Sequence, residues 1–213
     1  MKKLKKTQKI KEMVVNHLAK NKREYIIILI LFIIGIFSGV LFINNVKEEQ
    51  FRNISNYINT FIEKIKNIES INSLQLLKAS LWQNIGVALL IGFFGTTVIG
   101  IPVVFGLIIY KGFCLGYTIS SCIAVLGTSK GLAFLLSNLL LQNVISIPTI
   151  IAIAVSGFKL YKSILKDKRK ENIKLEIIRH ILFCGIMTIM LVIASLIEVF
   201  ISNNMLKMVV KYF

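Results

Sequence analysis

Residues able to do chemistry are few in this sequence, and their spacing matches no known catalytic or metal site. The chain has one aspartate, Asp167, in a polar loop, so the paired aspartates of an intramembrane protease are excluded. His17 and His180 lie outside the apolar segments, so we expect no Ser–His pair at membrane depth, and no His-Glu-x-x-His occurs. The cysteines form no Cys-x-x-Cys pair, and no phosphate-binding Gly-x-x-x-x-Gly-Lys-Ser/Thr loop is present. We therefore expect no enzyme, no cofactor and no metal.

The polar side chains inside apolar segments are the first candidates for a functional site. Asn138, Gln142 and Ser146 recur at intervals of four residues, and Asn143 lies beside them. An amide within hydrocarbon needs a partner, so this polar stripe should face other helices and hydrogen-bond to them. A path for a solute is the alternative interpretation.

Prolines and glycines suggest how the helices pack. Both prolines, Pro102 and Pro148, follow the similar runs Val-Ile-Gly-Ile and Val-Ile-Ser-Ile, and each predicts a kinked helix. Paired interrupted helices can mark a transport site, but proline is also simply tolerated in membrane helices, which is the interpretation we favour. Gly112 and Gly116 form a small-xxx-small pair that permits close helix packing. Glu198, near the end of the last apolar run, is expected to reach the headgroups.

The elements that carry these residues are membrane-spanning helices. The 213 residues are 55% hydrophobic with a mean hydropathy of +0.75, and their charges cluster between long uncharged stretches. This segregation is typical of a chain that crosses lipid, so the expected fold class is an all-α integral membrane protein. We predict five spans, of which the third is short, at about Tyr25–Ile43, Ile85–Tyr110, Phe113–Leu126, Leu132–Val155 and Ile181–Ile201.

The distribution of Lys and Arg predicts the orientation. With the N-terminus in the cytoplasm and the C-terminus outside, cytoplasmic segments hold 18 of the 26 Lys and Arg residues. The net charge of +16 is therefore interpreted as orientation and attraction to membrane lipids, not as nucleic-acid binding. The predicted segments are a basic cytoplasmic leader 1–24, helix 1 at 25–45, an external amphipathic loop 46–80, helices 2 to 4 within 81–157, a basic cytoplasmic loop 158–180, helix 5 at 181–201 and an external tail 202–213.

The external loop 46–80 contains one helix with an apolar seam. Its apolar residues are spaced alternately by three and four, at Phe51, Ile54, Ile58, Phe61, Ile65 and Ile68. Such a helix lies on the outer leaflet, binds a partner helix, or folds back onto its own bundle. Of these, only the second makes the seam a partner surface.

Two stretches resemble the stage II sporulation protein M family of endospore-forming bacteria. They are IGIPVVFGLIIYKGFCLGYT (99–118) and LLQNVISIPTIIAI (140–153), and their most specific parts are Lys111-Gly112-x-x-x-Gly116 and Gln142-Asn143-x-x-x-x-Pro148. The layout of a basic leader, one span, an external loop and four more spans is also similar. The Lys- and Ile-rich, Pro-poor composition suits a Clostridium-like source.

The resemblance implies a non-catalytic scaffold in the mother-cell membrane at the sporulation septum. Such a scaffold recruits the hydrolases known as stage II sporulation proteins D and P, which thin septal peptidoglycan during engulfment of the forespore. The alternative is a small membrane permease or channel subunit. The sequence leaves open whether the chain forms a homo-oligomer.

Overall fold

The computed structural model describes residues 18–67, 73–137, 141–166 and 173–202, together with Met205, Met208 and Val209. The regular structure of these residues is helical. Its elements in chain order are α2 (Lys22–Asn44), α3 (Glu48–Asn67), α4 (Ser73–Gly95), α5 (Ile101–Leu126), α6 (Thr128–Leu135), α7 (Leu141–Lys166), α8 (Ile173–Ile197) and the π-helical turn η2 (Glu198–Ser202).

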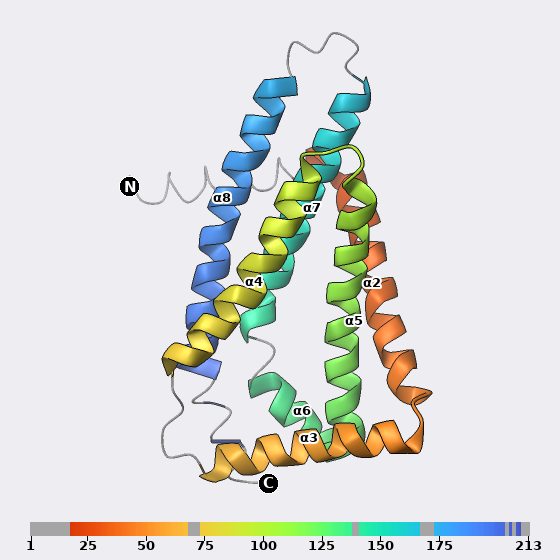
Figure 1. The fold of residues 1–213 in the computed structure, drawn as a ribbon, viewed down its shortest axis with the longest axis vertical. Helices are drawn as coiled ribbons and strands as arrows, with labels where there is room; N and C mark the ends of the chain where they lie inside the picture. Colours follow the sequence, from red (N-terminus) through yellow and green to blue (C-terminus); the bar gives the residue numbers. More distant parts are fainter. Residues whose placement is uncertain are drawn as a thin grey trace.

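Five of these helices are long and apolar enough to cross a membrane, which confirms the predicted fold class. The candidate spans are Lys22–Asn44, Leu77–Gly95, Ile101–Leu126, Asn143–Leu165 and Ile173–Ile201. Figure 1 shows that they alternate in direction, with α3 lying across one end of the bundle. We call this the α3 end; α2 and α8 begin at the opposite end. The orientation that places the α3 end outside the cell remains a prediction from the charges.

The predicted boundary between the second and third spans is wrong. The turn lies at 96–100, and Lys111 and Gly112 are inside α5. The Thr97 hydroxyl oxygen accepts a hydrogen bond of 3.0 Å from the Gly100 backbone N–H, and Pro102 stands in the first turn of α5. Proline suits that position because it lacks an N–H that the helix would leave unpaired. Pro102 therefore begins a helix and does not kink one, whereas Pro148 lies inside α7.

Other helices extend beyond their predicted limits. α4 begins at Ser73, inside the segment assigned to the external loop, and α7 continues to Lys166. α8 begins at Ile173, eight residues before the predicted start of the last span at Ile181. These extensions carry charged residues, which a search for uncharged runs leaves out.

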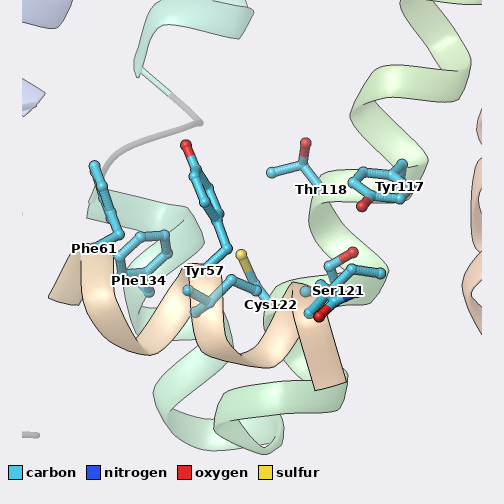
Figure 2. A pocket seen from close by; sticks show the side chains of 10 residues that line it. Tyr57, Phe61, Tyr117, Thr118, Ser121, Cys122 and Phe134 are labelled. Carbon is cyan, nitrogen blue, oxygen red and sulfur yellow. The ribbon is translucent and has the colours of Figure 1, made fainter. Parts of the chain in front are cut away.

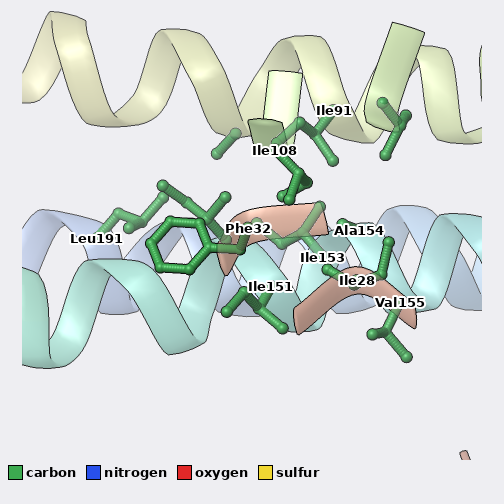
Figure 3. Close-up of a cluster of buried hydrophobic side chains, with 12 residues drawn as sticks. Ile28, Phe32, Ile91, Ile108, Ile151, Ile153, Ala154, Val155 and Leu191 are labelled. Carbon is green, nitrogen blue, oxygen red and sulfur yellow. The ribbon is translucent and has the colours of Figure 1, made fainter. Parts of the chain in front are cut away.

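The core of the bundle is an apolar cluster to which all five spanning helices contribute. Its fully buried members include Ile28 of α2, Ile91 of α4, Ile108 of α5, Ile153 of α7 and Leu191 of α8. Figure 3 shows these side chains meeting between the helices. A cluster shared by all five fixes their relative positions, while the outward faces remain apolar for contact with lipid.

Candidate functional site

The amphipathic helix α3 packs onto the bundle instead of standing free. Its buried residues Ile58, Ile62 and Ile65 form an apolar cluster with residues of α5 and α6 that include Cys122 and Phe134. Among the three arrangements considered for the seam, this is the fold back onto the protein's own bundle. The structure places most seam residues in or beside this contact, except that Ile68 lies outside the described residues.

The buried face of α3 is wider than the predicted seam. Phe51 and Ile54 of the seam are half-buried, while Phe61 is 38% exposed and Ile62, which is outside the seam, is buried. A narrow seam is the pattern of one partner helix, whereas α3 rests on both α5 and α6 and therefore buries a broader stripe. The regular three-and-four spacing of the seam residues gave no sign that Ile62 would also be buried.

A pocket of about 450 Å³ lies between α3, α5 and α6. Figure 2 shows Tyr57 and Phe61 of α3 on one side and Tyr117 and Ser121 of α5 on the other, with Phe134 of α6 beside them. The Ser121 hydroxyl oxygen is buried and has no hydrogen-bond partner among the described residues. The pocket is therefore mostly apolar, with one unsatisfied hydroxyl in its wall.

The opposite face of α3 is polar and exposed. It presents residues such as Arg52, Asn56, Asn59 and Glu63. The Tyr57 side chain lines the pocket between α3 and the bundle and is 74% exposed. Because α3 is held by its buried face, the α3 end offers a fixed surface formed by a helix of 20 residues.

The tightest contact within the bundle joins α2 to α5. A methyl group added to Gly112 would lie 2.3 Å from the Phe32 carbonyl oxygen, and one added to Gly116 would lie 2.2 Å from that of Ile36. The facing glycines of α2 are Gly35 and Gly39, whose added methyl groups would lie 2.2 and 2.3 Å from carbonyl oxygens of α5. The predicted small-xxx-small pair of α5 thus meets a second pair on α2, and only glycine fits at these four positions.

His180 joins three helices, and its predicted place outside the spans is wrong. It is buried in α8, 2.8 Å from the Ser156 hydroxyl of α7 through Nδ1 and 3.2 Å from the Gly92 carbonyl of α4 through Nε2. With the proton on Nε2, the ring donates to the carbonyl and accepts from the serine. A Ser–His pair therefore exists within the bundle, contrary to expectation. Gly95 and Gly157 approach closely beside it, with an added methyl on Gly95 3.1 Å from the Gly157 Cα.

A second polar cluster joins α4 to the end of α8. The Ser80 hydroxyl donates to Glu198, and the Asn84 amide lies 3.4 Å from Ser80 Oγ and 3.3 Å from Ser195 Oγ. Asn84 is fully buried, and its Oδ1 has no partner among the described residues. The expectation that Glu198 reaches the headgroups is wrong, since its carboxylate turns inward where η2 follows α8.

The structure describes only half of the predicted polar stripe on α7. Asn138 lies outside the described residues, and the side chain of Gln142 is also not described. Ser146 is buried, and its hydroxyl bonds to Asn143 Oδ1 of the same helix at 3.4 Å. The interhelical bonds expected of this stripe therefore stay a prediction.

No cluster of metal ligands is found among the residues that the structure describes: no three His, Cys, Asp or Glu side chains lie together there. The polar groups instead connect helices in pairs and threes, and the candidate interaction surface is the exposed polar face of α3.

Comparison with protein families matches residues 28–203 to the family described as stage II sporulation protein M. The match begins within α2 and extends past η2, so it covers most of the first candidate span and all of α3 and the other four spans. Searches of curated proteins and of solved structures gave no match.

Proposed function

The chain belongs to the stage II sporulation protein M family, a family of sporulation-related membrane proteins, and from this premise we propose that it is a non-catalytic scaffold of the sporulation septum. In this proposal it lies in the mother-cell membrane and recruits peptidoglycan hydrolases, namely stage II sporulation proteins D and P. These enzymes thin the septal wall so that the forespore can be engulfed.

The observation that carries the proposal is the fixed position of α3 across one end of the bundle. Its apolar face is occupied by α5 and α6, so its polar face is free to bind another protein. With the predicted orientation, that face lies on the outer side of the membrane, where peptidoglycan is found. Beside this face, Tyr57 lines the pocket between α3 and the bundle and is 74% exposed, and exposed tyrosines are frequent anchors of protein interfaces.

The Ser156–His180 pair fits a structural role within this proposal. The histidine is held between α4 and α7 by both ring nitrogens, which stabilises the contact of three helices. A serine nucleophile would also need a group that stabilises a developing negative charge, and proposing an enzyme would require such a group beside Ser156.

Co-purification of the two hydrolases from sporulating cells tests the proposal. Tyr57→Ala should lower their recovery several-fold without changing the amount of scaffold in the membrane, whereas Tyr57→Phe, which keeps the ring, should retain most of it. Replacing Ile58 is unsuitable because that side chain is buried against α6. If neither hydrolase is recovered with the unaltered protein, the scaffold proposal is wrong.

The permease alternative retains one observation in its favour. The Ser80, Asn84, Ser195 and Glu198 cluster places a carboxylate within a candidate span, and such residues often mark ion paths. Reconstitution of the purified protein into vesicles, followed by measurement of Na⁺ and proton flux, separates the two proposals: a scaffold gives the same flux as empty vesicles.

A further inference from the structure

A large apolar groove separates α4 from α5. Its volume is about 1070 Å³, and its walls are formed by α4 from Leu74 to Phe93 and by Tyr110, Lys111 and Cys114 of α5. Figure 1 shows the two helices spreading apart from the turn at 96–100 toward the α3 end. Several lining side chains are well exposed, including Trp82 at 82% and Phe93 at 68%. The groove is therefore open to the surroundings of the bundle over much of a span.

Lys111 and Gln83 place an ammonium group and an amide in this groove near the middle of the membrane. Lys111 follows the start of α5 by ten residues, which places it about 15 Å along a helix that crosses a core of about 30 Å. Gln83 is at a similar depth on α4, because it lies twelve residues before Gly95, which is at the same end of the bundle as the start of α5. Gln83 is exposed, Lys111 is half-buried, and none of the described residues that line the groove is acidic. An ammonium group and an amide in hydrocarbon require partners.

The protein's own carboxylates do not supply an ion pair for Lys111. Glu198 attracts it electrostatically, but no ion pair within 4.0 Å joins the two, and the Glu198 carboxylate accepts the hydrogen bond of Ser80. The other two acids within described spans, Glu24 and Glu176, are paired with Lys162 and Arg179 at 2.8 and 2.9 Å. The described spans of a second copy would offer Lys111 the same three carboxylates, of which two are ion-paired and the third accepts the hydrogen bond of Ser80.

Lipid does not satisfy Lys111 either. The phosphates of lipid headgroups lie about 15 Å from the bilayer centre, farther than a lysine side chain reaches, and acyl chains carry no charge. The shape of the groove and its charge are both matched by a helix that crosses the membrane and carries one acid. Gly86 in the groove wall leaves open space within 4 Å of the position of a methyl group, so a helix can approach there.

We propose that the groove between α4 and α5 binds a transmembrane helix of a partner protein, and that a carboxylate near the middle of that helix pairs with Lys111. The proposal deepens the proposed scaffold function and rests on it, because it states what kind of membrane anchor a recruited partner would carry. It places a second contact within the membrane in addition to the surface of α3.

Trp82 provides a direct readout because it is the single tryptophan of the chain and lines the groove. The purified full-length protein is reconstituted in phosphatidylcholine vesicles with a leucine-alanine transmembrane peptide that carries a quencher and either one central Glu or one central Gln. The Glu peptide should quench Trp82 fluorescence at a mole fraction about tenfold lower than the Gln peptide, as expected for one added polar contact between helices.

Variants of Lys111 identify the contact. Lys111→Met should remove the advantage of the Glu peptide, Lys111→Arg should retain it, and Lys47→Met, outside the spans, should leave it unchanged. Equal quenching by both peptides with the unaltered protein, or an advantage that survives Lys111→Met, would overturn the proposal. Co-purification of the hydrolases alongside equal quenching would refute only the groove, whereas Glu-selective quenching without co-purification would refute only the hydrolase scaffold.

Discussion

The two sides of α5 show opposite kinds of packing. Toward α2, the pairs Gly35 with Gly39 and Gly112 with Gly116 bring the backbones so close that no methyl group fits. Toward α4, the same helix borders a groove of about 1070 Å³. A helix that is fully packed on one side and open on the other has a fixed position and a free surface, which is what a binding site within a membrane needs.

The open side persists because other contacts hold α4. His180 hydrogen-bonds to the Gly92 carbonyl, Gly95 contacts Gly157, and Asn84 reaches Ser195. These contacts direct α4 toward α7 and α8 and leave its other side to face α5 across the groove. The groove therefore results from the docking of α4 on α7 and α8, and α4 itself is held firmly by these contacts.

The largest effect on stability is expected from a side chain added on the closed side of α5, where it packs against α2. Gly116→Val would place Cβ 2.2 Å from the Ile36 carbonyl oxygen, and because this is backbone, the helices must separate. We expect a loss of at least about 3 kcal/mol in the free energy of unfolding, at the upper end of overpacking effects. Equilibrium unfolding in detergent micelles measures this change.

Gly106→Val is the matched control for that substitution. Gly106 is on the same helix, but nothing lies within 4 Å of its added methyl group. The control should change the free energy of unfolding by less than about 1 kcal/mol. Similar losses in the free energy of unfolding for both variants would show that the contact between α2 and α5 does not require glycine.

Filling the open side should impair binding without unfolding the protein. Gly86→Phe puts a ring into the groove, where an added methyl group meets nothing within 4 Å. The Glu peptide should then quench Trp82 only at a mole fraction at least about tenfold higher, while the unfolding transition stays within about 1 kcal/mol. Undiminished quenching would place the peptide elsewhere on the bundle.

The hydrogen bonds of His180, which connect α8 to α4 and to α7, should be individually modest. Ser156→Ala removes the hydrogen bond to His180 and should cost about 1 kcal/mol, as is typical between membrane helices. Sporulation should continue with this variant, because the pair is structural in the proposed scaffold. A complete block of sporulation in cells with normal protein levels would indicate that Ser156 has a chemical role.

The smallest effect is expected at Asn84. Its amide makes two long hydrogen bonds, of 3.3 and 3.4 Å, while its buried Oδ1 has no partner among the described residues. Asn84→Leu loses the two hydrogen bonds but also removes the buried oxygen that has no partner. These effects oppose each other, so the free energy of unfolding should change by less than about 1 kcal/mol. A loss near 3 kcal/mol would show that Oδ1 has a partner such as buried water.

The number of spans was predictable from the sequence, because uncharged apolar runs reflect the thickness of the bilayer. The ends of the helices were not, since Lys111 lies within α5 and His180 within α8. One charged or ionisable residue is tolerated inside a span when a groove or neighbouring helix surrounds it, and this depends on tertiary structure. The turn at 96–100 did have a local signal in Thr97, Gly100 and Pro102.

The packing surfaces were predictable only in part. Gly112 and Gly116 were identified from their spacing, and the same spacing of Gly35 and Gly39 in the first span carried the matching signal. The elements that the α3 seam contacts could not be predicted, because an apolar stripe shows that a helix face is buried but does not show which element covers it. The groove was not predictable at all, since it depends on where α4 docks.

Site-specific photocrosslinking tests the contrast between the open groove and the rest of the bundle most directly. A benzophenone amino acid replaces Phe93, which is 68% exposed in the groove, or Phe37 of α2, which is 64% exposed outside it. In sporulating cells, position 93 should crosslink to a transmembrane segment that contains Asp or Glu near its middle, and Lys111→Met should abolish that product, whereas position 37 should give only lipid adducts. Lipid adducts alone at both positions, a second copy of this chain at position 93, or a captured helix without an acid would contradict the account.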